Sequence, residues 1–343
     1  MNISSRFGRS VARLAVLSAC LIASSFGPRG TVQATPSLGF TSVTISASGV
    51  PEIALKTLSA THQVRISTKG LSDVHMTSNV VVPGGYRVTG RQGFSTGCRH
   101  ATWVAAHAQV IENSEVRLDG GEPEMRYLYV PVGEAELLDT WHVRGMRGTG
   151  THHFAVHDVF VPAERTVLSA TAPLFNDGPL YKIPRTLAFA SGDAAVALGM
   201  SRSCLETFYD LAGSKTPRAV QGLLRDQSMT QVGVGHAEAA LRSGRAFLME
   251  AVSDIWHEAT TGEVTLERRA ALRLASTHCI RLAAQIIESI YSLSGATAAY
   301  DGNLIQRHFQ DIHVITQHLQ GRPAHYELVG RHWLGLPIDQ ARL

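Results

Sequence analysis

Three histidines near the middle of the chain are of the residue type that binds metal ions: His152, His153 and His157. On a strand, His153 and His157 would point the same way but lie about 13 Å apart at ~3.3 Å per residue. One ion cannot bind both at metal–nitrogen distances of about 2.0–2.1 Å. We therefore predict no metal site in this segment.

Asp311 and His318 are a second candidate pair. They lie seven residues apart, and in a helix two turns would bring both side chains to one face. A histidine on a helix face is usually packed or solvated. The spacing alone therefore leaves a chemical role for His318 open.

A glycine-rich loop, Arg144-Gly145-Met146-Arg147-Gly148-Thr149-Gly150, is flanked by arginines. Such loops let backbone N–H groups approach an anion. The loop lacks the third glycine of a dinucleotide fingerprint and the Gly-Lys-Ser/Thr ending of a P-loop. A tight turn before a strand is the alternative interpretation.

Cys98 follows Thr96-Gly97 and precedes Arg99-His100. It could be a thiolate beside positive charge or a buried, small apolar side chain. The sequence contains no GxSxG, HExxH or CxxC pattern, so a standard hydrolase or zinc enzyme has no support.

The composition limits the possible classes. With 343 residues, the chain is long enough for about two domains at roughly 150 residues each. Hydrophobic residues make up 44% and charged residues 17%, which excludes global disorder. The formal net charge of +3 does not indicate a nucleic-acid or membrane-surface partner. The 4 cysteines are widely spaced, as is typical of a reducing, cytoplasmic location.

The spacing of apolar residues along the sequence changes after Pro184. Before it, short alternating runs predict an antiparallel β-domain, with strands expected at 86–90, 102–110, 125–130 and 154–161 and weaker ones within 35–82. After it, apolar residues spaced three or four positions apart predict helices. These helices are expected at 187–211, 218–260, 265–293, from Asn303 onward and at 324–335. Asn303 and Gln306 have the spacing of a capping box. We expect a divergent segment at 1–83, a β-domain at 84–176 and a helical bundle at 177–343.

Five blocks carry a family resemblance: residues 84–91, 94–101, 139–150, 158–162 and 309–318. They resemble the acyl-CoA-dehydrogenase-like flavin monooxygenases, the two-component aromatic hydroxylases. The resemblance implies an α+β fold, with an antiparallel β-domain followed by a C-terminal helical bundle, in a homotetramer. It also implies reduced FMN or FAD from a separate flavin reductase, oxygen as co-substrate and a small aromatic substrate.

The resemblance also assigns roles to individual residues. Thr96 falls where the family has a hydroxyl near flavin N5, and His318 falls at the family's catalytic histidine. Leu319 and Gln320 offer no carboxylate base of the acyl-CoA dehydrogenase type, and Gln310 stands where the family often has arginine. The other residues expected to line the flavin are Phe94, Ser95, Gly97, Trp141, Arg147 and Thr149.

The first part of the chain departs most from the family, and we expect the family's N-terminal helical domain to be missing or replaced here. Residues 19–31 resemble the family's first β-domain strand, which would bring Ser25 near the flavin. Alternatively, residues 1–34 form a secretory signal and the protein is exported. Two rival functions remain open: an acyl-CoA dehydrogenase, and a non-catalytic remnant that serves as an oligomerisation partner.

Overall fold

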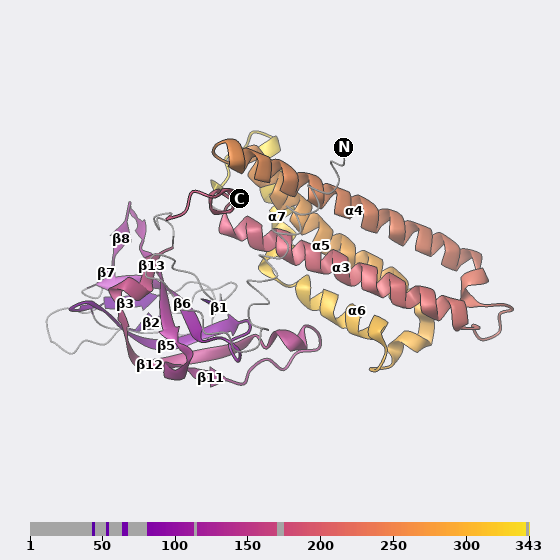
Figure 1. Cartoon of the computed structure of the whole chain (residues 1–343), viewed down its shortest axis with the longest axis horizontal. Helices are drawn as coiled ribbons and strands as arrows, with labels where there is room; N and C mark the ends of the chain where they lie inside the picture. Colours follow the sequence, from indigo (N-terminus) through magenta and orange to yellow (C-terminus); the bar gives the residue numbers. More distant parts are fainter. Residues whose placement is uncertain are drawn as a thin grey trace. The chain divides into compact units, whose positions relative to one another are not determined.

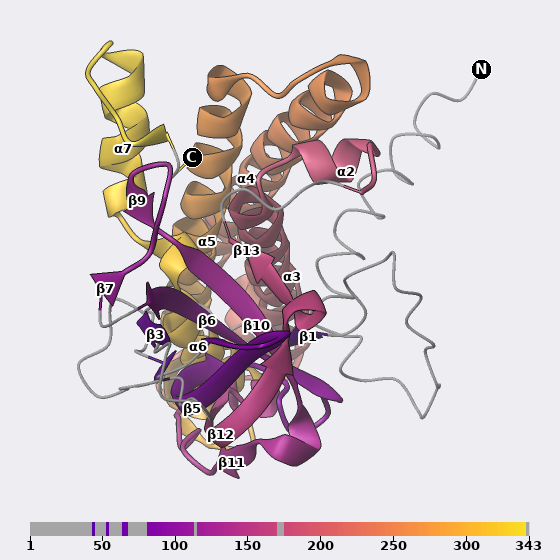
Figure 2. The ribbon, with the colours of Figure 1, turned by 90° about the vertical axis from the view of Figure 1, so that its left-hand side faces the viewer.

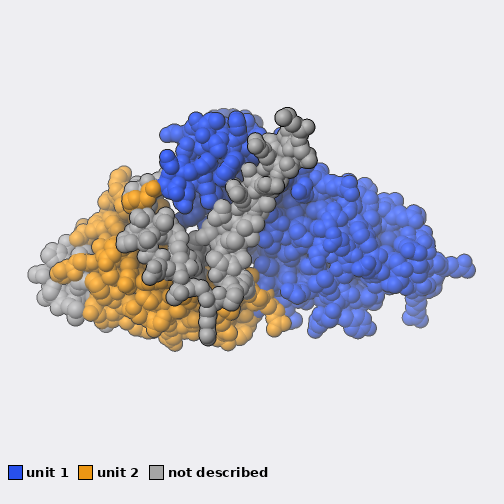
Figure 3. Space-filling model, viewed as in Figure 1, with its two compact units in different colours: residues 1–19, 143–146, 176–343 blue, residues 20–142, 147–175 orange. Residues whose placement is uncertain are grey.

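The computed structural model describes residues 81–112, 115–169, 175–340 and 343, together with 43–44, 53–54 and 64–67. The predictions for residues 1–34, Ser25 included, therefore lie outside the described residues. The described residues fall into two compact units (Figure 3). The helical unit comprises Val143–Met146 and Asn176–Leu343, and the β unit comprises the described residues up to His142 and Arg147–Phe175.

The described strands of the β unit form an 11-stranded sheet and a separate 2-stranded sheet of β8 and β9 (Figure 1). The main path of the large sheet has the order β11-β12-β5-β2-β3-β6-β10-β13, and β1, β4 and β7 pair beside it. Among the described strands, all pairs are antiparallel except β1 with β6. The strands are β1 (Val43–Thr44), β2 (Ile53–Ala54), β3 (Val64–Ser67), β4 (Val81–Val82), β5 (Gly85–Ser95), β6 (Trp103–Glu112), β7 (Glu115–Val116), β8 (Leu118–Asp119), β9 (Glu122–Pro123), β10 (Met125–Pro131), β11 (Glu136–Leu138), β12 (His152–Pro162) and β13 (Thr166–Leu168).

Alternation along the long strands builds the core of the β unit. Val88, Val104, Leu128 and Phe154 are fully buried in one cluster, and residues two apart in a strand share a face. β5 and β12 pair with a register shift between His152 and Phe154. The extra residue on β5 is accommodated as a β-bulge, and this irregularity lies just before the turn that ends β5.

The helical unit is a bundle whose long helices run side by side in both views (Figures 1 and 2). Its helices are α2 (Pro179–Lys182), α3 (Arg185–Ser214), α4 (Ser228–Thr261), α5 (Leu266–Ser294), α6 (Leu304–Ile315) and α7 (Ala324–Trp333). Thr265 caps α5 by accepting a hydrogen bond from the Arg268 N–H. One apolar cluster runs through the bundle and includes Leu205, Phe208, Ile255, Leu272 and Ile287, all fully buried.

One helix boundary and one helix cap differ from the expectation. α4 begins at Ser228, not at Arg218, because Ala219 and Gly222 adopt positive φ angles of 61° and 82° that break helical backbone. Asn303 caps α6 through the Ile305 N–H. The expected capping box does not form, since the Asn303 N–H donates to the Tyr300 carbonyl.

The end of α6 matters for the expected Asp311–His318 face. α6 stops at Ile315, and the Gln317 and His318 N–H groups donate to carbonyls three residues back, those of Val314 and Ile315. This tightened turn carries His318 off the helix. The prediction that Asp311 and His318 share one helix face is therefore wrong.

None of the helices in the described ranges combines the length and the apolar character that a bilayer crossing requires.

Candidate flavin site and its relatives

A chain of three threonine hydroxyls lies at the end of β5. The Thr96 hydroxyl is 3.1 Å from that of Thr151, and the Thr151 hydroxyl is 2.7 Å from that of Thr149. The Gly97 N–H donates to the Thr149 carbonyl at 2.9 Å, which ties the turn after β5 to the loop before β12. Thr96, Gly97 and Thr149, which the sequence predicted as site residues, therefore lie together.

Ser95 and Phe94 precede this chain and have unusual environments. Ser95 is fully buried, and its hydroxyl forms no hydrogen bond with the residues that the structure describes. Phe94 has a positive φ of 56°, which is rare for a non-glycine residue and is typical of functional or strained positions. Its ring packs edge-to-face against Trp141, with 6.5 Å between ring centroids.

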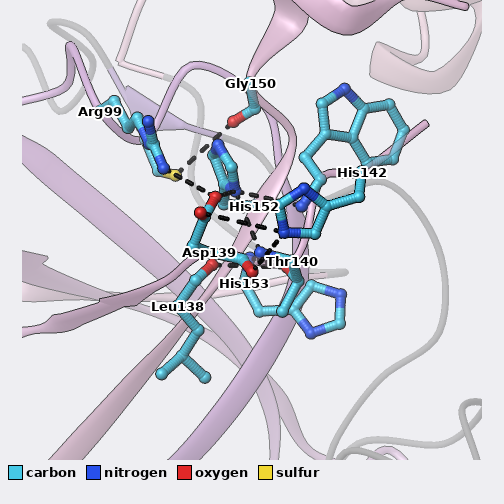
Figure 4. A network of polar contacts seen from close by, with 10 residues as sticks. Arg99, Leu138, Asp139, Thr140, His142, Gly150, His152 and His153 are labelled. Carbon is cyan, nitrogen blue, oxygen red and sulfur yellow. Dashed lines mark hydrogen bonds and ion pairs between the residues drawn. The ribbon is translucent and has the colours of Figure 1, made fainter. Parts of the chain in front are cut away.

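The segment that carries Trp141 is held by His152 (Figure 4). The N–H groups of Thr140 and Trp141 both donate to His152 Nδ1 at 3.1 Å. Nδ1 must therefore be unprotonated, with the proton of the neutral ring on Nε2. The 3.3 Å approach of Asp139 to the same atom is then a contact without a shared proton. Burial, followed by the nearby Arg99 guanidinium, lowers the pKa of His152.

His153, beside it on β12, has a different set of partners. Its Nδ1 lies 3.1 Å from an Arg91 guanidinium nitrogen, and its ring packs against that of Phe94. Burial and the Arg91 charge lower the pKa of His153. Within the described residues, no group of three or more His, Cys, Asp or Glu side chains is arranged to hold a metal ion.

Cys98 is a buried thiol. It is fully buried, and its Sγ lies 3.8 Å from the Gly150 carbonyl oxygen. Burial raises the pKa of the Cys98 thiol despite the neighbouring Arg99. Of the two interpretations, the structure therefore favours the small apolar side chain over the reactive thiolate.

The first half of the glycine-rich loop packs against α6 within the helical unit. A Cβ on Gly145 would lie 2.2 Å from the Gln310 carbonyl oxygen, so only glycine fits there. The Met146 N–H donates to Asp311 Oδ1 at 2.5 Å. Asp311 also lies 3.7 Å from Arg307, so it has partners although residue 310 is Gln rather than Arg. Arg147, which begins the second half of the loop, is exposed in the β unit.

His318 lies in the helical unit, where it caps the short 3₁₀ helix η6 (Leu319–Gly321). Its Nδ1 is 2.9 Å from Asp193 Oδ2 on α3. The Gln320 N–H approaches the same nitrogen at 3.5 Å. Each unit is described by itself, so the role predicted for His318 beside Thr96 remains a prediction.

Sequence reasoning missed three residues of these constellations. Thr151 directly follows the glycine-rich loop, and its hydroxyl type was a usable signal. His152 was considered only as a metal ligand. Asp193 lies inside an apolar helical run far from His318 in sequence, where no local pattern marks it.

The chain is similar to known proteins in three comparisons. Residues 191–323 match the family model for the acyl-CoA dehydrogenase C-terminal domain. An indole-3-acetate monooxygenase of Pseudomonas putida is 32% identical over 257 residues, which are 74% of this chain and 64% of the relative. The oxygenase subunit HsaA, a flavin-dependent monooxygenase of Mycobacterium tuberculosis, is 30% identical over 272 residues, covering 76% of this chain and 68% of the relative.

The fold of the chain is also similar to that of relatives whose structures have been solved. The crystal structure of a 3-HSA hydroxylase from Rhodococcus superimposes with a TM-score of 0.69 at 26% identity, covering 88% of this chain and 72% of that one. These matches confirm the predicted α+β fold and the resemblance. The chain thus spans a little under two thirds of the indole-3-acetate monooxygenase, and it belongs to the family of flavin-dependent monooxygenase oxygenase subunits with the acyl-CoA-dehydrogenase-like fold.

Proposed function

We propose that this chain acts as the oxygenase of a two-component monooxygenase. It would take reduced FMN or FAD from a separate flavin reductase and hydroxylate a small aromatic compound with molecular oxygen. The names of the relatives, an indole-3-acetate monooxygenase and a flavin-dependent oxygenase subunit, support the reaction and the substrate class. A cytoplasmic location and assembly as a homotetramer belong to the same proposal.

The observation that carries the proposal is the set of polar and aromatic groups at the end of β5. An isoalloxazine ring needs hydrogen-bond partners at its edge and apolar contact at its faces. Thr96 is half-buried, with its hydroxyl oriented by Thr151. The buried Ser95 hydroxyl has no hydrogen bond within the described residues, and Phe94 and Trp141 offer ring surfaces. These groups fit a flavin.

Each of these residues has a definable task in the proposal. Thr96 would hold a hydrogen bond at the flavin N5 edge, and Thr151 would fix the direction of that hydroxyl. The exposed Arg147 would meet the flavin phosphate, because guanidinium groups bind phosphate oxygens well. Bound reduced flavin would supply the electrons that activate oxygen. Trp141, held by His152, would exclude water from the ring.

His318 is the proposed proton-handling residue of the helical unit. A histidine serves in such a role because its charge changes near neutral pH. The adjacent Leu319 and Gln320 cannot abstract a proton as a carboxylate would. The Gln320 side chain is also buried and bonded to Arg273, which disfavours the acyl-CoA dehydrogenase alternative.

The proposed reaction is tested by mixing the chain with reduced FMN or FAD, oxygen and an aromatic acid such as indole-3-acetate. Hydroxylated product and hydrogen peroxide are measured separately. We expect product that depends on reduced flavin and falls about 10²-fold or more in His318→Gln, the scale of general acid–base groups. Product formation from an acyl-CoA would instead support the dehydrogenase. Failure to bind any reduced flavin would support the non-catalytic remnant.

A further inference from the structure

The glycine-rich loop divides between the two units. Residues Val143–Met146 belong to the helical unit, and residues Arg147–Phe175 belong to the β unit. The chain therefore passes from one unit to the other at the peptide bond between Met146 and Arg147. Whatever fixes Met146 also fixes the point at which the β-unit part of the loop begins.

Met146 is fixed within the helical unit by three kinds of contact. Its N–H donates to Asp311 Oδ1 at 2.5 Å, and its side chain packs against the apolar cluster of the bundle. The preceding Gly145 lies so close to the Gln310 backbone that no Cβ fits. A hydrogen bond to a carboxylate is stronger than one to a neutral oxygen. Asp311 therefore adds a directional hold that packing alone does not supply.

The backbone of Met146 needs such a hold. Its φ angle is 53°, in the left-handed region that is unfavourable for a residue with a side chain. The loop reaches a positive φ again at Gly150, with 52°, where a glycine adopts it without that cost. A non-glycine residue stays in this conformation only where its surroundings enforce it. For Met146 these surroundings are the Asp311 carboxylate and the packing on α6.

Asp311 is well placed to act on the loop. Its side chain is 17% exposed, and its Oδ2 lies 3.7 Å from Arg307 Nε, one helical turn earlier on α6. The Arg307 side chain is 74% exposed, and exposed ion pairs contribute little to stability. The hydrogen bond to the loop therefore does not depend on Arg307, which makes Arg307 a suitable control position.

The path from Met146 to the threonine hydroxyls at the end of β5 is short. The 3₁₀ helix η2 (Arg147–Thr149) follows directly and is closed by the Gly150 N–H, which donates to the Arg147 carbonyl at 3.3 Å. The Thr149 carbonyl in turn accepts the Gly97 N–H at 2.9 Å. Because a closed turn of this length has few free torsions, a displacement of Met146 is carried to Thr149.

We propose that Asp311 is a positioning residue of the flavin site, which acts by holding the Met146 N–H and so fixing the loop that bonds Gly97. The inference rests on the proposed function for the flavin and on the geometry within each unit for the loop. Without the Asp311 acceptor, the left-handed backbone of Met146 relaxes and the Thr149–Gly97 bond opens more often. Thr96, directly before Gly97, then presents its hydroxyl to the flavin less well.

Hydrogen exchange of the full chain, resolved to single amides, tests the loop without flavin. In Asp311→Ala the Met146 amide should exchange about tenfold faster or more, the scale of one lost hydrogen bond to a charged group. The Gly97 amide should exchange faster as well. Asp311→Asn keeps a neutral oxygen as acceptor and should raise both rates by less. Arg307→Gln is the matched control and should leave both rates unchanged.

Anaerobic calorimetry with reduced FMN and with reduced FAD supplies the second readout. Asp311→Ala should raise the Kd of the flavin that the wild-type chain binds by about tenfold, and Asp311→Asn should lie between the two. Ile255→Val separates positioning from a general loss of stability. It trims a fully buried side chain on α4, which destabilises the bundle, and it should leave the Kd unchanged.

The two readouts can each overturn the proposal. An unchanged Met146 amide in Asp311→Ala refutes the hold on the loop, and an unchanged Gly97 amide confines Asp311 to a local role. A Kd that Asp311→Ala does not alter, or that Ile255→Val raises equally, refutes the positioning of the flavin site. If Asp311→Ala does not fold, Asp311→Asn decides, since Met146 and Gly97 must then exchange faster together.

Failure of the proposed function is distinguishable from failure of this inference. If the wild-type chain binds neither reduced flavin but Asp311→Ala accelerates exchange at both Met146 and Gly97, the hold on the loop stands and the monooxygenase assignment falls. If the wild-type chain binds reduced flavin and Asp311→Ala changes neither exchange nor Kd, the assignment stands and the role of Asp311 falls.

Discussion

His152 Nδ1 lies 3.1 Å from the amide nitrogen of Trp141 and accepts its hydrogen bond only while that nitrogen is unprotonated. The same atom accepts the Thr140 N–H. One neutral imidazole therefore satisfies two backbone donors in the segment that presents Trp141. The arrangement makes the order of this segment depend on the protonation state of His152.

Acid should loosen the Trp141 segment. Burial lowers the pKa of folded His152 below its ordinary value of 6.5, so the unfolded chain binds more protons. The stabilisation is present above pH 6.5 and is lost as the pH falls through the lower folded pKa. We expect Trp141 fluorescence to change and the free energy of unfolding to fall over that range.

Substitution of His152 distinguishes its contribution to the acid response from that of the other histidines. His152→Phe should remove the acid response of Trp141 and cost about 1–3 kcal/mol, because two half-buried N–H groups lose their acceptor. His142→Gln is the control, since the His142 side chain is 74% exposed. An equal effect of the two substitutions on the acid response would contradict the assignment.

Alanine substitutions at Gly145 and Gly148 should have sharply different effects on stability, although the two glycines share a loop. A Cβ on Gly145 would lie 2.2 Å from the Gln310 carbonyl oxygen, whereas a Cβ on Gly148 meets nothing within 4 Å. Gly145→Ala should lower the free energy of unfolding by about 1–3 kcal/mol through overpacking. Gly148→Ala should change it by less than about 0.5 kcal/mol. Denaturant titration compares the two, and similar losses would refute the packing of this loop on α6.

Replacing Arg273 and replacing Gln320 by an apolar residue should have different effects on the free energy of unfolding. The Arg273 side chain is 2% exposed, burial lowers its pKa to about 10, and no carboxylate of the described residues pairs with it. Arg273→Met should be neutral or stabilising, as is common for buried charges replaced by apolar residues. Gln320→Leu should cost about 1.5–3 kcal/mol because it leaves the guanidinium without its acceptor. Chemical denaturation measures both, and a large loss in Arg273→Met alone would reverse this ranking.

Periodic segments were the most predictable part of the fold. Strands β5, β6, β10 and β12 and helices α3 and α5 follow their apolar patterns closely. The start of α4 and the end of α6 did not follow theirs, because positive φ angles at Ala219 and Gly222 and a tight turn at His318 override local periodicity. Such backbone choices depend on tertiary contacts.

The candidate site was predictable in its residue types and less so in its partners. The grouping of Thr96 with Thr149 followed from the resemblance. The roles of Thr151 and His152 arise from the pairing of β5 with β12 and from a β-bulge, which single-sequence patterns do not reveal. Asp193 meets His318 across two helical segments, and no spacing rule links residues so far apart.

Flavin binding by the β5 cluster is the central claim, and anaerobic calorimetry of the chain with reduced and oxidised FMN and FAD tests it most directly. We predict tighter binding of the reduced form. Thr96→Val should weaken it about tenfold, the equivalent of one hydrogen bond of about 1.4 kcal/mol, and Thr96→Ser should retain it. Equal or tighter binding of oxidised flavin, or no effect of Thr96→Val, would contradict the account.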